Sequence, residues 1–272
     1  MLFFALTTTL GFPNLIDGTS LKSIIFDMDG TLVSSLSTIM HCENKISLKY
    51  TNQSLTLEDV IANFGPPART IIRNMTANLS KELQERAVSD YYECYSKNVP
   101  SKVLVFPGVI PLLKRIRSSG RHLALVTGVE KIMMQYTLDP FDLSRFFEAR
   151  VTADDVRSGK PDPEGINLAL KRIKGEPRES MYIGDSPVDI LAGKRAGVLT
   201  GAALWSPENR GDPTAEHPDH EFRSIQQLSD FLFRKRKQDQ EPYFGSDLPH
   251  TRQSQSKNPR VKVHTEKSND GR

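Results

Sequence analysis

The chain has 272 residues, of which 38% are hydrophobic and 25% are charged, so its composition excludes a fully disordered chain and a collagen-like chain. No run of 18 or more apolar residues occurs, and the sequence therefore predicts no membrane-spanning helix. The chain has 36 Lys and Arg and 33 Asp and Glu. Residues 234–272 contain 10 of the basic and 5 of the acidic residues, so the remainder of the chain is slightly acidic. This distribution offers little support for nucleic-acid binding.

Residues 1–15 are apolar and uncharged. They lack the basic region and cleavage site of a secretory signal and the arginines of a mitochondrial presequence. We therefore expect residues 1–20 to be an extension ahead of the first strand. That strand is predicted at 23–26, where Ser-Ile-Ile-Phe runs into Asp27-Met28-Asp29-Gly30.

Residues 36–103 form a predicted helical insertion after the first strand. Helical runs occupy 36–48, 56–64, 69–79 and 81–95, and no convincing strand interrupts them. The only two cysteines, Cys42 and Cys94, lie in this insertion and are too few for a disulfide framework. A reducing compartment fits them best, so we expect a cytoplasmic protein; a single bridge between them is the second interpretation.

Residues 104–233 return to an alternating pattern after Phe106-Pro107-Gly108. Strands are predicted at 122–126, 180–183 and 197–204, and helices at 110–118, 164–174 and 188–196. This alternation predicts an α/β fold, a Rossmann-like parallel sheet with helices on both faces, built from 21–35 and 104–233.

The C-terminal residues 234–272 contain few apolar side chains and are predicted to be a basic, disordered tail. The cluster Arg234-Lys235-Arg236-Lys237 fits a nuclear-import signal or a contact with an anionic partner. A solvated helix end is the interpretation that we favour.

The strongest chemical signal is the pair of carboxylates that follows the first strand. Side chains two residues apart in a strand point to the same side, so Asp27 and Asp29 enter one pocket. Asp185 follows another predicted strand and adds a third carboxylate, although a helix N-cap explains it equally well. Oxygen ligands without nearby Cys or His select Mg²⁺ over zinc.

Two weaker signals suit a phosphate ester. Thr127 and Gly128 end a strand and offer a hydroxyl and a free N–H, although such a pair is usually a simple turn. Lys160 lies on a loop stiffened by two prolines, where a solvated lysine is the alternative. Ligands of open parallel sheets bind at the carboxyl ends of the strands. These two signals therefore support a phosphate site only together with the carboxylates that follow the other strands.

The order of these parts resembles the haloacid-dehalogenase (HAD) superfamily over residues 22–230. The resemblance rests on FDMDGTL at 26–32, Thr127, GKPDP at 159–163 and GDSPVD at 184–189. The helical insertion is similar to the cap of the phosphoglycolate-phosphatase and pyrophosphatase-like branch, as are FGPP at 64–67 and FPGV at 106–109. What the resemblance implies is a Mg²⁺-dependent phosphatase acting on a small phosphorylated metabolite.

On the matching positions, the resemblance implies that Asp27 attacks phosphorus and forms an aspartyl-phosphate. Asp29 protonates the leaving oxygen and then activates water. Thr127 and the N–H of Gly128 hold the phosphoryl oxygens, and Lys160 neutralises charge on Asp27 and the phosphate.

The resemblance also implies that Mg²⁺ is held by Asp185, a carboxylate of Asp27 and the main-chain carbonyl of Asp29. Asp189 stands behind the ligands and fixes the loop or a metal-bound water. One departure is Ser34, which replaces the aspartate that the branch carries in the hinge. It bears on cap closure and substrate rather than on catalysis.

The cap is expected to select the substrate because it closes over the leaving group. Its candidate contacts are Arg69, Arg73, Lys45 and His41, and Arg69 is the one that we favour. Two alternatives stay open. A phosphomutase of the β-phosphoglucomutase kind needs a histidine in the hinge, for which His41 is the candidate, and a non-enzymatic regulator could use the same fold.

Overall fold

The computed structural model describes residues 17–207 and 211–234. Its strands are β1 (Ser23–Phe26), β2 (Val33–Ser34), β3 (Leu104–Val105), β4 (His122–Val126), β5 (Ala149–Val151), β6 (Ser180–Gly184), β7 (Leu199–Ala203) and β8 (His220–Phe222). Its α-helices are α1 (Leu36–Thr51), α2 (Leu57–Ala62), α3 (Ala68–Met75), α4 (Lys81–Lys102), α5 (Val109–Ser118), α6 (Lys131–Leu138), α7 (Glu164–Ile173), α8 (Pro187–Ala196) and α9 (Ile225–Phe233).

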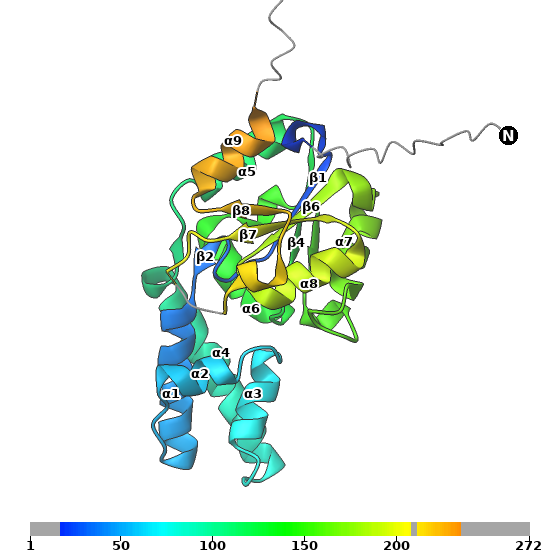
Figure 1. Cartoon of the computed structure of the whole chain (residues 1–272). Helices are drawn as coiled ribbons and strands as arrows, with labels where there is room; N and C mark the ends of the chain where they lie inside the picture. The colour runs from blue at the N-terminus through cyan, green and yellow to red at the C-terminus, as the bar shows by residue number, and fades with distance from the viewer. Residues whose placement is uncertain (1–16, 208–210, 235–272) are drawn as a thin grey trace, which may run out of the picture. The chain divides into compact units, whose positions relative to one another are not determined.

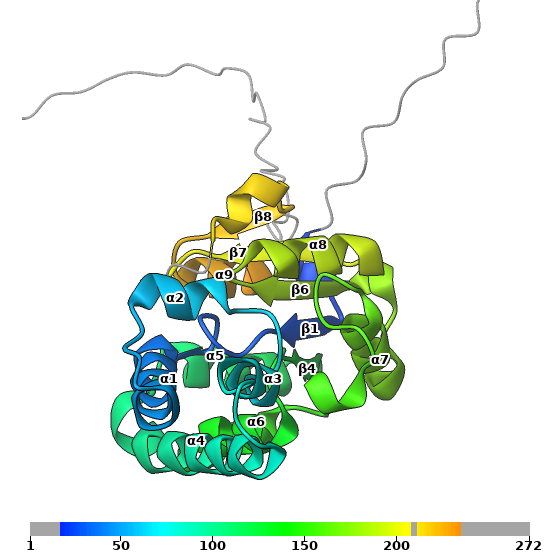
Figure 2. The ribbon, with the colours of Figure 1, turned by 90° about the horizontal axis from the view of Figure 1, so that it is seen from below.

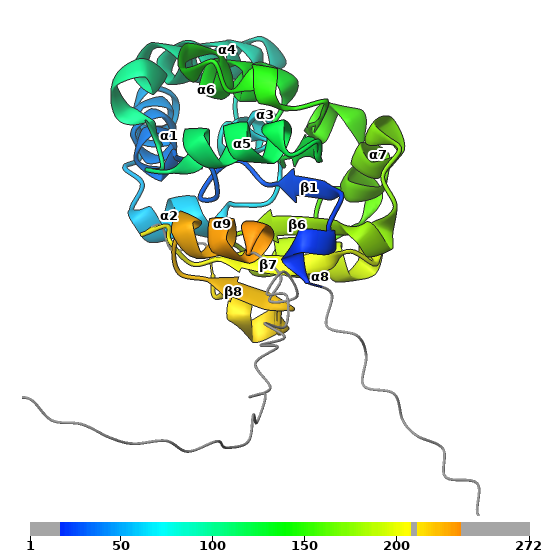
Figure 3. The ribbon, with the colours of Figure 1, turned by 90° about the horizontal axis from the view of Figure 1, so that it is seen from above.

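Six strands form one parallel sheet in the order β5-β4-β1-β6-β7-β8, which confirms the predicted α/β fold (Figure 1). Consecutive side chains of β1 enter opposite faces, as the period of two requires. Ile24 and Phe26 pack with α5 and α9, whereas Ile25 packs with α7 and α8. Figure 3 shows these two pairs of helices on opposite sides of the strands. Helices therefore cover both faces, and the sheet is buried on both sides.

The helical segment, which we define as α1 to α4, follows the first strand and lies on one side of the sheet (Figures 1 and 2). The chain enters it through β2 and leaves it through β3, and these two short strands pair antiparallel, with Val33 opposite Val105. The predicted domain boundaries, 21–35 with 104–233 and 36–103, stay a prediction.

The structure contains elements that the sequence pattern did not reveal, namely β2, β3, β5, β8, α6 and α9. β5 has three residues, with an exposed Arg150 between two buried neighbours, and is too short to show a period. β8 begins with a half-buried histidine at the sheet edge. α4 runs to Lys102, past its predicted end, with Pro100 inside its last turn.

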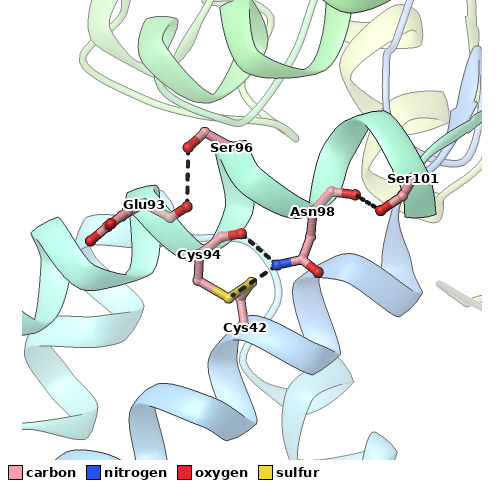
Figure 4. The surroundings of a disulfide bond; sticks show 6 residues. All are labelled: Cys42, Glu93, Cys94, Ser96, Asn98 and Ser101. Atoms are coloured by element: carbon pink, nitrogen blue, oxygen red, sulfur yellow. Dashed lines mark hydrogen bonds between the residues drawn. A yellow bond between two sulfur atoms is a disulfide. The ribbon is translucent and has the colours of Figure 1, made fainter.

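The two cysteines are bonded to each other, which corrects the interpretation that both thiols are free (Figure 4). Cys42 on α1 and Cys94 on α4 have Cα atoms 5.8 Å apart, and both side chains are buried. The helical period places each cysteine on the face where α1 and α4 meet. Only the packing of the two helices, 52 residues apart in sequence at this point, decides the pairing.

None of the helices within 17–207 and 211–234 combines the length and the apolar character that a membrane crossing requires. Of the predicted N-terminal extension, residues 17–20 are described, and Gly18–Ser20 form a short 3-10 helix in which Gly18 is buried. The predictions for residues 1–16 and for the basic tail beyond Arg234 lie outside the described residues.

Candidate active site

Three loops of the candidate site begin at the carboxyl ends of neighbouring strands. β1 pairs with β4 and with β6, and Phe26 lies opposite Leu125 and Ile183. Asp27 therefore leaves β1 beside the points where Thr127 leaves β4 and Asp185 leaves β6. The chain order of the strands reverses at β1, the position where ligands enter open parallel sheets.

Lys160 lies between two buried carboxylates. Its Nζ is 2.8 Å from Oδ1 of Asp27 and 2.5 Å from Oδ1 of Asp189. Burial alone would lower the pKa of Lys160, but the charges of Asp189 and Asp27 raise it well above its ordinary value. The side chain is thus a buried ammonium aimed at Asp27, and not a solvated lysine on a loop.

Asp27 is 6% exposed, and burial raises its pKa to about 7. The charge and hydrogen bond of Lys160 oppose this rise, whereas the charges of Asp189 and Asp29 add to it. Positive charge near this carboxylate, such as that of a bound divalent cation, would favour its ionised form.

Asp189 is held on every side. It is the third residue of α8 and forms a capping box with Ser186, whose N–H and hydroxyl donate to Oδ2. The hydroxyl of Tyr182 and the ammonium of Lys160 donate to Oδ1. Burial tends to raise the pKa of Asp189, but Lys160 and these donors lower it. Asp189 therefore positions Lys160 and the turn between β6 and α8.

The carboxylate of Asp185 packs directly against the backbone of Gly30. Its Oδ1 accepts a hydrogen bond of 3.2 Å from the hydroxyl of Thr31. Gly30 has a φ of +79°, and a Cβ at this position would lie 2.0 Å from Oδ2 of Asp185. Only glycine satisfies both the backbone turn after Asp29 and the close approach of the Asp185 carboxylate.

Carboxylate oxygens of Asp27, Asp185 and Asp189 lie within 4.8 Å of one another, and all three residues are buried. Such a cluster of hard oxygen donors could hold a divalent cation of the Mg²⁺ kind. The donors on Asp189 already engage both of its oxygens, whereas Asp27 and Asp185 face the cavity described below. The residues present therefore fit a cation held by Asp27 and Asp185.

Asp29 is 5% exposed and is tied to the first turn of the helical segment. Its Oδ1 accepts a hydrogen bond of 2.5 Å from the hydroxyl of Ser35, the fully buried residue that precedes α1. This contact links the second predicted carboxylate to the point where the chain enters the helices.

A cavity of about 760 Å³ lies between these loops and the helical segment. The strand-end loops contribute Asp27, Asp29, Thr127, Gly128, Lys160 and Asp185 to its lining. The sequence had predicted all six as site residues, and the structure brings them together around one space. The helical segment closes the opposite side, largely with apolar and aromatic side chains.

Arg69 is not among the residues that line this cavity. Its Nε lies 3.2 Å from Oε1 of Glu130, and one terminal nitrogen lies 2.6 Å from Oδ1 of Asp154. The other predicted cap contacts, Arg73, Lys45 and His41, are exposed or paired away from the cavity. The structure thus places Arg69 in a contact between α3 and the loops after β4 and β5, apart from the cavity.

Glu130 is a residue that sequence reasoning missed. It is fully buried, and its carboxylate accepts hydrogen bonds from the N–H groups of Ala68 and Arg69 at the start of α3. The hydroxyl of Tyr92 donates to it as well. In the sequence, a glutamate next to a lysine at the start of a helix is typical of a solvent-exposed residue. No local pattern therefore indicates that Glu130 is buried.

The comparisons with known proteins agree with this geometry. Residues 24–203 match the family described as "Haloacid dehalogenase-like hydrolase". Phosphoglycolate phosphatase 1 of Pseudomonas aeruginosa is 31% identical, over 72% of this chain and 73% of that protein. Pyrophosphatase PpaX of Oceanobacillus iheyensis is 26% identical, over 77% of this chain and 95% of that protein.

Among solved structures, a predicted phosphoglycolate phosphatase from Haemophilus somnus superimposes with a TM-score of 0.69 at 23% identity. The match covers 79% of this chain and 97% of that one, and at this identity it supports the fold alone. The family match spans the strands and loops that carry the carboxylates and Lys160. This chain therefore belongs to the haloacid dehalogenase-like hydrolases.

Proposed function

We propose that the protein is a Mg²⁺-dependent phosphatase that hydrolyses a small phosphate ester through an aspartyl-phosphate on Asp27. The observation that carries the proposal is the buried cluster of Asp27, Lys160 and Asp185 at one wall of a closed-over cavity. The relatives named as phosphatases support the same reaction class.

In the first step, a carboxylate oxygen of Asp27 attacks phosphorus, and the bond from phosphorus to the leaving oxygen breaks. Asp29 gives its proton to that oxygen, and its hydrogen bond from Ser35 holds it in place. In the second step Asp29 takes a proton from water, which attacks phosphorus and releases Asp27 and inorganic phosphate.

Thr127 and the N–H of Gly128 line the cavity beside Asp27, where they would hold phosphoryl oxygens. Lys160 balances the charge of Asp27 and phosphate. Asp27, Asp185 and the carbonyl of Asp29 would hold Mg²⁺, which supplies positive charge at the reacting oxygens. Asp189 acts through Lys160 and the α8 turn, as its hydrogen bonds indicate.

We further propose that residues 36–103 act as a cap that covers the leaving group, with 21–35 and 104–233 as the catalytic domain. Transfer to a sugar in place of water would need a histidine near Asp29. His41 is exposed on α1 and does not line the cavity, so hydrolysis is the reaction that the geometry supports.

The test is Asp27→Asn, assayed on a panel of phosphate esters with Mg²⁺ and with a chelator. We expect phosphate release by the wild type only with Mg²⁺, and none by Asp27→Asn, because the amide is a poor nucleophile. Asp230→Asn, on the exposed face of α9, is the matched control and should keep full activity. Turnover by Asp27→Asn would contradict the nucleophile.

A further inference from the structure

One buried carboxylate of the helical segment belongs to no part of the reaction described so far. Glu43 on α1 is 1% exposed and lines the cavity that Asp27 and Lys160 enter from the opposite side. Ile39, one helical turn earlier, lines the same cavity, so this face of α1 is turned toward the substrate space.

Glu43 is not satisfied by the protein. Its Oε2 is buried and has no hydrogen-bond partner in the described part of the chain, which includes the whole helical segment. A buried carboxylate oxygen without a donor is costly, and native proteins rarely keep one unless a ligand or water completes it. Consistently, burial raises the pKa of Glu43 to about 7.

The surroundings of Glu43 are apolar and aromatic. Tyr91 and Tyr95, one turn apart on α4, line the same cavity, and the charge of Glu43 contributes to the raised pKa of Tyr91. No Lys, Arg or His of the fully described segment 36–102 is among the lining residues. The segment therefore offers an acceptor to the leaving group and no cation.

We infer that Glu43 selects substrates whose leaving group ends in a hydrogen-bond donor, a hydroxyl or an ammonium, and rejects leaving groups that end in a carboxylate or phosphate. The inference rests on the proposed phosphatase function. The phosphoryl end meets Lys160, Asp27 and Asp185, while the far end meets Glu43. An anionic far end would place two negative charges together at this wall of the cavity.

The disulfide helps to fix this geometry. Cys42 precedes Glu43 on α1, and Cys94 lies between Tyr91 and Tyr95 near the middle of α4. The bond holds together the two helices that carry the acceptor and the rings around it. Glu43 is therefore presented from a braced pair of helices rather than from a loop.

The experiment compares matched ester pairs that differ only at the terminal carbon, hydroxymethyl against carboxylate. Three chain lengths are used, so that the panel includes different distances between the phosphorus and the far end of the leaving group. The pairs are glycerol 3-phosphate with 3-phosphoglycerate, erythritol 4-phosphate with 4-phosphoerythronate, and sorbitol 6-phosphate with 6-phosphogluconate. For each pair, the ratio of kcat/KM is measured with Mg²⁺ at about pH 8.5, above the pKa of about 7 of Glu43, so that its carboxylate is charged.

At the length that reaches Glu43, we expect the wild type to prefer the hydroxyl partner by about 10- to 100-fold, the range of a hydrogen bond to a charged group. Glu43→Gln keeps the shape and removes the charge, and should reduce that ratio at least tenfold. Glu43→Leu, which matches the apolar neighbours, should abolish the preference. The aminomethyl analogue of the responsive length then separates ammonium from hydroxyl recognition.

Glu93→Gln is the matched control, since Glu93 lies on α4 beside Cys94 but is exposed and paired with Lys97. It should leave all ratios unchanged. Ratios that Glu43→Gln does not alter, or a wild-type preference for the carboxylate partners, would overturn the inference while the phosphatase stands. Hydrolysis of no ester in the panel would overturn both.

Discussion

At the scale of single residues, the site depends on close contacts between residues that come from different loops. Gly30 and Asp185 come from different loops and meet where a methyl group has no space. Asp27 and Lys160 are 133 residues apart and share a hydrogen bond. Each pair forms only because β1 and β6 are neighbours in the sheet or because the 160 loop folds back over them.

Gly30→Ala should displace the Asp185 carboxylate and lower kcat/KM by about 10- to 100-fold, the usual cost of disturbing a support of a metal ligand. Gly120→Ala is the matched control. Gly120 has nearly the same φ, +77° against +79°, and open space around its Cβ. It should cost about 1 kcal/mol of stability and leave activity intact. Equal activity of both variants would contradict the clash.

The buried carboxylate of Glu43 predicts a pH-dependent stability. Its pKa of about 7 in the folded protein exceeds the ordinary value of 4.5, so the folded state holds a proton that the unfolded state releases between these values. Raising the pH through this window should therefore destabilise the fold, by up to about 3 kcal/mol at 1.36 kcal/mol per pH unit.

Denaturant unfolding at pH 4 and pH 8 checks this. Glu43→Gln removes the titrating group, so it should match the wild type at pH 4 and exceed it at pH 8. Tyr91 is the ionisable neighbour that faces Glu43, and its pKa lies well above this window. A wild type as stable as Glu43→Gln at pH 8 would contradict the buried charge.

At the scale of elements, buried contacts join the helical segment to the sheet and to the helices that cover it. The paired strands β2 and β3 connect the sheet to the helical segment. The hydroxyl of Ser35, just before α1, donates a hydrogen bond to Asp29. Glu130, from the loop after β4, caps the start of α3 with its carboxylate. Because Glu130 is three residues from Thr127, this contact connects the helices to the loop that we propose for phosphate.

Glu130→Gln should weaken the attachment of α3, because the charge is lost and one of the two acceptor oxygens becomes an NH2 donor that faces N–H groups; the expected cost is about 1–3 kcal/mol. Hydrogen exchange of the amides in 68–75 should become faster. The matched control is Glu85→Gln, which breaks an exposed pair with Arg73 inside the helical segment and should cost less than about 1 kcal/mol. Identical exchange in the two variants would contradict the capping role.

The Cys42–Cys94 bond braces α1 against α4. Reduction, or the double variant Cys42→Ala with Cys94→Ala, should lower the free energy of unfolding by about 2–4 kcal/mol, since the unfolded chain regains the freedom of the closed loop. Unfolding of the double variant should not respond to reductant. Two titratable thiols in the untreated protein would show that the bond does not form.

At the scale of the whole described molecule, the parallel sheet brings together residues that are far apart in sequence. The register of β1 with β4 and β6 sets Asp27, Thr127 and Asp185 along one edge. The helical segment then covers that edge and turns the open end of a sheet into a cavity of about 760 Å³. In the function that we propose, the sheet side of this cavity carries the reaction and the helical side selects the leaving group.

The amino-acid sequence by itself determined the α/β fold, the helical run after the first strand and six of the residues around the cavity. These signals are local: apolar strands that end in Asp or Thr, and helical spacing without strands. The reach of α4, the strand β5 and the helix α6 escaped prediction, because short or polar-faced elements carry too little periodicity.

Only the tertiary structure decided which long-range pairs form. It joined Cys42 to Cys94, turned Arg69 toward Glu130 and Asp154, and left Glu43 buried on the cavity wall. Helical spacing says which face of a helix a side chain occupies, but not which neighbour that face meets. That choice depends on how four helices and a sheet pack, a property that no window of the sequence contains.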